Sequence, residues 1–113
     1  MNRTPPIPPH PELLRAPTPS FGWLDASLLR DGWLGLLGPE AVAALTLLAL
    51  AADGHGASFY RRETMALALS FPRHELDRCL DRLLELRLVA HRPWTPGHID
   101  GVWQLMPVPT DWR

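Results

Sequence analysis

Residues 65–89, MALALSFPRHELDRCLDRLLELRLV, decide the fold of this chain. They predict a short helix ending near Leu69, a tight turn at residues 70–72, a longer helix over residues 73–86 and then a strand. In the longer helix, apolar residues recur three or four positions apart, which places them on one face. These residues are Leu76, Cys79, Leu80, Leu83 and Leu86. Most other positions are charged, so we expect this helix to bury one side and expose the other.

A second, strongly apolar helix is predicted upstream, over residues 39–52. Pro39 and Glu40 are typical of a first helical turn, and residues 53–56 contain glycines that end the helix. Because the segment is apolar nearly all round, we expect it to be the central, buried helix. The apolar run that begins at Ala41 is about a dozen residues long, which is too short to span a bilayer, so no membrane association is expected.

Further elements complete the expected order. A helix begins at Arg61 or Arg62 and ends at the turn described above, and residues 58–60 form either a short extended piece or the lead into that helix. Residues 88–93 and 102–106 have strand-like patterns and flank a loop with Pro and Gly, which predicts a hairpin. The expected fold class is mainly α with a small β-hairpin, that is α+β.

The first 20 residues differ in composition from the rest of the chain. They hold seven of the 13 prolines, and proline cannot donate a backbone hydrogen bond and disrupts a helix interior. An extended, polyproline-like arm is therefore expected. This arm is either disordered or docks on a partner subunit or another protein. The folded domain is accordingly assigned to residues 21–113.

Residues 21–37 carry more large apolar side chains than one short helical face can bury. Glycines interrupt the segment, so a turn or short strand near residues 21–24 and one or two short helices are expected. The excess of apolar surface predicts that part of this extension covers the interface of a homodimer. The candidate interface residues are Trp23, Leu24, Leu28, Trp33 and Leu37.

The composition restricts the function classes. The chain has 113 residues, 46% of them hydrophobic, which suits one domain with a packed core. Its formal net charge is −1 and all 11 basic residues are Arg, a balance unlike that of non-specific nucleic-acid binders. The single cysteine, Cys79, excludes an intrachain disulfide and is consistent with a cytoplasmic protein. No metal-ligand spacing, catalytic constellation or phosphate-binding motif is visible, so we expect no enzyme, metal or cofactor.

Over residues 39–106, the chain resembles bacterial winged helix-turn-helix DNA-binding proteins. The residues that carry the likeness are Met65, Ala66, Leu69, Ser70, Phe71, Pro72, Leu76, Leu80, Leu83, Leu86, Leu88 and Val89. They follow the family patterns LA..LGLS and V..AL..L...GLV. The family usually has Gly where this chain has Ser70 and Arg87, which implies for Arg87 a differently closed helix end or mild strain. The resemblance implies binding to double-stranded DNA, as a transcriptional regulator or a mobile-element or plasmid-associated protein.

The resemblance also implies which side chains contact DNA, because the second helix of such a motif lies in the major groove. The DNA-facing candidates on this helix are Arg73, His74, Arg78 and Arg82, with Arg61, Arg62 and Arg92 on phosphates and His98 in the wing loop. Alternating charges at residues 77–82 also fit an ordinary solvated helix. The alternative function is therefore a protein–protein interaction module, an adaptor without base readout. The near-neutral charge favours it, as do the docking candidates Trp23, Trp33, Trp94 and Trp103.

Overall fold

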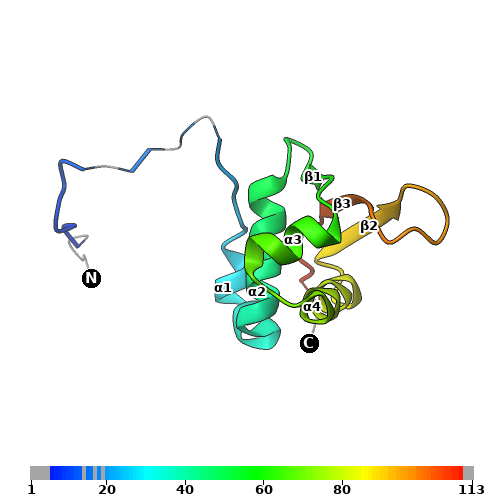
Figure 1. Ribbon diagram of the computed structural model, residues 1–113. Helices are drawn as coiled ribbons and strands as arrows, with labels where there is room; N and C mark the ends of the chain where they lie inside the picture. Colours follow the sequence, from blue (N-terminus) through cyan, green and yellow to red (C-terminus); the bar gives the residue numbers. More distant parts are fainter. Residues whose placement is uncertain (1–5, 14, 17, 19, 111–113) are drawn as a thin grey trace.

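The fold is taken from a computed structural model, in which residues 6–13, 15, 16, 18 and 20–110 are described. Its elements are α1 (Ser27–Arg30), α2 (Trp33–Ala51), β1 (Ala57–Ser58), α3 (Arg62–Leu69), α4 (Arg73–Glu85), β2 (Val89–Pro93) and β3 (Gly101–Leu105). The strands form one antiparallel sheet in the order β1–β3–β2, and the helices pack beside it (Figure 1). The α+β class predicted from the sequence is confirmed.

Helix α2 is the centre of the fold, as predicted. It contacts the other three helices and the strands β1 and β3. Its buried side chains are Trp33, Leu37, Ala41, Ala44, Leu45, Leu48 and Ala49. Two helical segments meet at Gly38, whose φ of 81° and ψ of 167° suit glycine, and Pro39 begins the second segment. The predicted start at Pro39 is thus confirmed for the second segment, but a further helical stretch precedes it.

The length of α2 also corrects an argument made from the sequence. With 19 residues, the whole helix is long and apolar enough to cross a membrane by length and composition alone. The apolar run that begins at Ala41 is only the second part of this helix. The central helix of a globular core meets the same criterion, and the contacts of α2 with every other helix fit that role.

Helices α3 and α4 are the helical part of the segment that decides the fold. Leu76, Cys79, Leu80 and Leu83 are the buried residues of α4, so the predicted apolar face is confirmed at these positions. From α3, Met65 and Ala66 join the same core. Their burial fixes α4 against α2 and α3 and leaves its charged side facing outward.

Both helices end in the same left-handed turn. Ser70 follows α3 with φ 56°, and Arg87 closely follows α4 with φ 61°. In each turn the next N–H donates to a carbonyl oxygen five residues back, at 2.9 Å from Phe71 and at 3.1 Å from Leu88. These bonds define a Schellman closure, which usually has Gly at the left-handed position. Of the two alternatives for Arg87, the structure has the strained one, at a cost of about 1–2 kcal/mol.

The predicted hairpin is present, and a third strand extends it. Strand β2 pairs with β3 along its whole length, and β1 pairs with the other edge of β3, with Ser58 opposite Trp103. Residues 58–60 therefore begin as an extended piece. Gly101 is required at the end of the hairpin, because a Cβ there would lie 2.1 Å from the carbonyl oxygen of Arg92.

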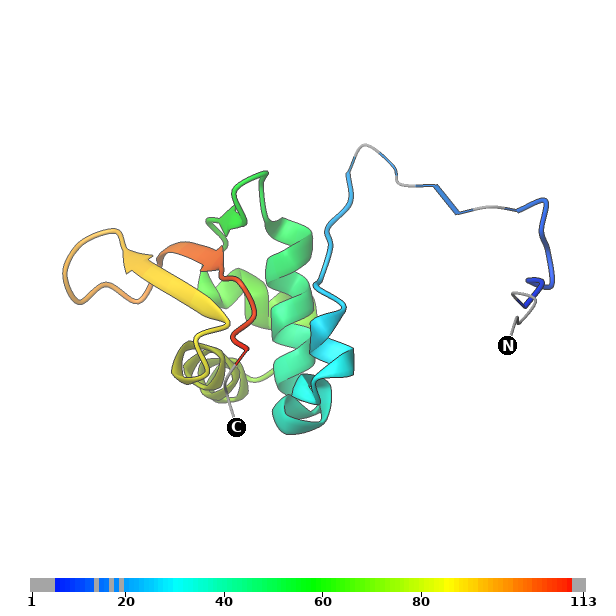
Figure 2. The ribbon, with the colours of Figure 1, turned by 180° about the vertical axis from the view of Figure 1, so that it is seen from behind.

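The N-terminal segment leaves the body of the protein beside α2. Gly22 lies against the backbone of Ala49 and Leu50, where an added Cβ would come within 2.4 Å of the Ala49 carbonyl oxygen. The described residues before position 20 belong to no helix or strand and extend away from the body (Figure 2). No strand forms at residues 21–24. Of the prolines that define the arm, Pro5, Pro17 and Pro19 lie outside the described residues.

Candidate nucleic-acid interface

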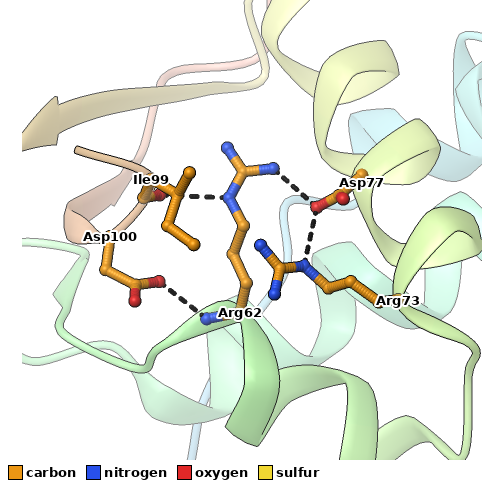
Figure 3. A network of polar contacts seen from close by, with 5 residues as sticks. All are labelled: Arg62, Arg73, Asp77, Ile99 and Asp100. Carbon is orange, nitrogen blue, oxygen red and sulfur yellow. Dashed lines mark hydrogen bonds and ion pairs between the residues drawn. The ribbon is translucent and has the colours of Figure 1, made fainter. Parts of the chain in front are cut away.

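The start of α3, the N-terminal half of α4 and the loop between β2 and β3 meet on one side of the molecule. Arg62 connects all three (Figure 3). Its backbone N–H donates to Asp100 Oδ1 at 2.9 Å, and its Nε donates to the carbonyl oxygen of Ile99 at 3.1 Å. Its Nη1 donates to Asp77 Oδ1 at 2.8 Å. One residue therefore holds α4 and the loop in place relative to α3.

The environment of Arg62 argues against the phosphate contact predicted for it. Its side chain is only 14% exposed, and its guanidinium carbon lies 5.3 Å from the ring centre of Trp103, within the range of a cation–π contact. His91 stacks on the same ring, with ring centres 4.2 Å apart. We therefore reassign Arg62 from DNA contact to structural support of the interface.

Arg73 is held differently, at the surface. Its Nε donates to Asp77 Oδ1 at 3.1 Å, across one turn of α4, and its side chain is 42% exposed. A guanidinium has five N–H groups, so this bond leaves four of them available. Asp77 thus orients the Arg73 side chain while its outer edge remains open to a ligand.

Asp77 is ionised at neutral pH in this arrangement. Partial burial raises the pKa of Asp77, but the hydrogen bonds from Arg62 and Arg73 outweigh burial and hold this pKa below the ordinary value of 3.8. One carboxylate therefore offsets one of two guanidinium charges. Among these three side chains a single positive charge remains, and the carboxylate of Asp100, bound by the Arg62 backbone N–H, lies beside it.

Arg78 and Arg82 lie toward α2. Both line an open pocket of about 310 Å³ together with Glu40 of α2. Arg78 forms an ion pair with Glu75, yet its side chain remains 73% exposed. Arg82 is half-buried and has no ion pair among the described residues. Arg78 is thus accessible to a ligand, whereas Arg82 is only partly so.

The remaining basic candidates surround this surface. His74, on α4, and Arg61 and Arg92 are exposed, and neither Arg has an ion pair within the described part of the chain. His98 Nδ1 accepts a hydrogen bond from the backbone N–H of Asp100 at 2.9 Å, so this side chain stabilises the loop. Farther along α4, the carboxylates of Asp81 and Glu85 are exposed as well, so basic and acidic side chains alternate on this helix.

The loop between β2 and β3 adds an aromatic surface that sequence reasoning found only in part. Trp94 stacks on Phe59 with ring centres 6.1 Å apart, and the two residues are 54% and 58% exposed. Ile99, in the same loop, is 51% exposed. The pairing of β1 with β3 brings Phe59 to the loop, and this contact between distant segments has no local sequence signal.

Three of the five residues predicted at a dimer interface belong to the core. Leu28, Trp33 and Leu37 are at most 8% exposed and pack within this chain. The interface prediction is therefore wrong for these three residues, because α1 and the first segment of α2 fold back and bury them. Trp23 and Leu24 remain exposed at the surface.

Two of the four tryptophans predicted to dock a partner are also interior. Trp33 and Trp103 are 0% exposed, whereas Trp23 and Trp94 are on the surface. Any docking through tryptophan is therefore restricted to the latter two.

Metal-binding groups and similarity to known proteins are two further guides to function, and neither gives one for this chain. No group of three or more His, Cys, Asp or Glu side chains that could hold a metal ion occurs among the described residues. The chain matches no protein-family model, and it has no match among curated proteins or solved structures. Its function is therefore argued from the geometry of the surface around α4.

Proposed function

We propose that this protein is a winged helix-turn-helix protein that binds double-stranded DNA through α4. Support comes from the order of its elements, in which α2, β1, α3 and α4 precede a β2–β3 hairpin and the sheet runs β1–β3–β2. In helix-turn-helix proteins the second helix of the motif enters the major groove. Here that helix is α4, and the β2–β3 loop is the wing.

The orientation of Arg73 carries this proposal. The carboxylate of Asp77 accepts a hydrogen bond from its Nε, which leaves the N–H groups of the two terminal nitrogens for other acceptors. A guanidinium held in this way suits bidentate hydrogen bonding to guanine or to a phosphate. His74 and Arg78 are exposed on the same half of α4, so three donors occupy the end of the helix that reads base edges in this motif.

The carboxylates on α4 set the expected strength of binding. The three Arg of α4 stand against four carboxylates, so with His74 neutral its side chains sum to a charge of −1. Arg62 of α3 is withdrawn into the structure. Since affinity for DNA depends on the number of phosphates neutralised, we expect modest binding per chain that weakens with salt. The same interface serves a transcriptional regulator or a mobile-element or plasmid-associated protein.

The test compares loss of two interface cations with loss of a distant one. Duplexes are first selected from a randomised pool at low salt with the native protein. Binding of the selected duplex is then titrated for the native protein, for Arg73→Ala/Arg78→Ala and for Arg30→Ala. Arg30 is an exposed cation at the end of α1, which packs on α2.

We expect the double variant to bind at least about tenfold more weakly, with a salt slope lower by roughly two. Arg30→Ala should bind like the native protein. Equal affinities for the double variant and the native protein, or no enrichment of any duplex, would refute DNA binding through α4.

The second candidate function is a protein-interaction module, and the exposed side chains of Phe59, Trp94 and Ile99 favour it. A wing that grips phosphate needs cations, whereas this loop presents aromatic and aliphatic surface. The alternative predicts no enrichment of duplexes by the native protein at any salt concentration.

A further inference from the structure

An apolar groove lies open between α2 and α3, on surface that the DNA proposal does not use. Its volume is about 440 Å³, and its lining includes Leu47 and Leu50 of α2, Tyr60, and Ala68 and Leu69 of α3. We call it the α2–α3 groove. Leu50 is 66% exposed and Tyr60 45% exposed. Large apolar side chains with this exposure at a groove are typical of a binding surface.

The Pro-rich arm carries uncovered apolar side chains of its own. Ile7 is 80% exposed and Leu13 is 71% exposed, and Pro8, Pro9 and Pro11 lie between them. Such a sequence favours polyproline geometry, and a turn in which the Leu13 N–H donates to the His10 carbonyl oxygen at 3.0 Å follows it. A segment with this limited freedom loses little conformational entropy on docking. Polyproline segments dock into apolar grooves that present aromatic rings, and Tyr60 provides one here.

We propose that the α2–α3 groove binds the Pro-rich arm, residues 1–20, of a second copy of this chain. Two-fold symmetry then lets each copy place its arm in the groove of the other, so that both grooves are filled. This inference concerns residues other than Arg73, His74 and Arg78, and it stands independently of DNA binding.

The root of the arm favours a second copy over the same chain. Gly22 packs directly on Ala49 and Leu50, and Leu50 lines the groove. From this point the arm runs away from the body (Figures 1 and 2). In the structure the described residues of the arm lie outside the groove of their own chain, which leaves that groove open. The uncovered apolar side chains of the arm and the open groove therefore fit each other between two copies.

The experiment uses full-length chains, one preparation labelled with ¹⁵N and one unlabelled, mixed in equal amounts. In both, a benzophenone amino acid replaces His10 in the arm, and photo-crosslinked peptides are analysed by mass spectrometry. We expect crosslinks from position 10 to residues 43–69, with heavy–light pairs among them, and a dimer in sedimentation equilibrium. Heavy–heavy and light–light pairs alone would mean that each arm fills its own groove, which overturns the proposal.

Surface variants identify the groove as the site. Leu50→Asp and Ala68→Glu change exposed positions on the two walls, so the fold should survive. Each should weaken dimerisation by about tenfold to a hundredfold and remove the crosslinks. Leu29→Asp, at a 72% exposed leucine of α1, is the matched control and should change neither. A monomer at all concentrations, or a dimer without crosslinks to residues 43–69, would refute arm exchange.

Discussion

The outer face of α4 and the β2–β3 loop are neighbouring surfaces with different chemistry. On α4, Arg73 and Arg78 each pair with a carboxylate of the same helix. On the loop, Trp94 and Ile99 are exposed, and the loop itself has no Arg or Lys. The cationic donors of the proposed DNA contact thus lie on α4, each beside a carboxylate, while the loop offers apolar contact. Arg62 joins the two surfaces because its guanidinium binds both.

The largest expected effect on stability follows from removing the Arg62 side chain that connects the two surfaces. Arg62→Met removes the hydrogen bonds to Asp77 and Ile99 and the cation–π contact with Trp103. We expect the free energy of unfolding to fall by about 2 kcal/mol, measured by urea denaturation. Arg61→Met, at the adjacent exposed arginine, should change it by less than about 0.5 kcal/mol. Equal stability of the two variants would show that the connection is energetically unimportant.

The chain link between the two surfaces is also strained, at Arg87. Arg87→Gly relieves the left-handed backbone but increases the entropy of the unfolded chain, so the net gain should be about 0.5–1 kcal/mol. Arg87→Ala keeps the strain and serves as the control. Thermal unfolding of the three proteins measures the difference, and a glycine variant no more stable than the alanine variant would contradict it.

Removing negative charge from α4 should increase the difference in charge between α4 and the loop. Asp81→Asn/Glu85→Gln removes two exposed negative charges, and DNA affinity at low salt should rise by roughly twofold for each. The gain should disappear at high salt. Trp94→Ala, on the loop, should leave the salt slope unchanged. If both variants alter the salt dependence of DNA affinity equally, α4 and the loop do not differ in their electrostatic contribution to binding.

The smallest effect concerns His91, beneath the loop. Burial lowers the pKa of His91, and the charge of Arg62 lowers it further against the opposing effect of Asp100, so it lies below 6.5. Below pH 6.5 the unfolded chain then binds a proton that the folded chain does not, and stability falls as the pH is lowered. Urea denaturation at pH 7.5, 6.5 and 5.5 should show a weaker decline for His91→Phe, which keeps an aromatic ring on Trp103. If stability falls equally with pH in the native protein and in His91→Phe, protonation of His91 does not cause the fall.

Local patterns predicted the elements well where they reflect helical periodicity. The four buried residues of α4, the hairpin and the Pro39 start follow from spacing and turn chemistry alone. The third strand and the helical stretch before Gly38 were missed or predicted only loosely, because both depend on packing against distant segments.

The candidate surface was harder to predict, and Arg61 and Arg62 show why. The two residues are identical and adjacent, yet the first faces solvent and the second lies over Trp103. Only the placement of β3, some 40 residues later in the sequence, distinguishes them. Trp33 and Leu37 were likewise assigned to an interface because the sequence does not show how much surface α1 and α2 cover within one chain.

The packing of Gly22 on α2 gives the N-terminal segment a firm tether. Twenty residues at full polyproline extension would span about 60 Å, and the turn at residues 10–13 shortens that reach. The tip therefore explores a limited sphere around that root. Within that sphere the local concentration of a tethered segment is on the order of millimolar. Once one arm is bound to the groove of another copy, binding of the second arm becomes intramolecular. A low affinity of each groove for an arm is then enough to keep the dimer together.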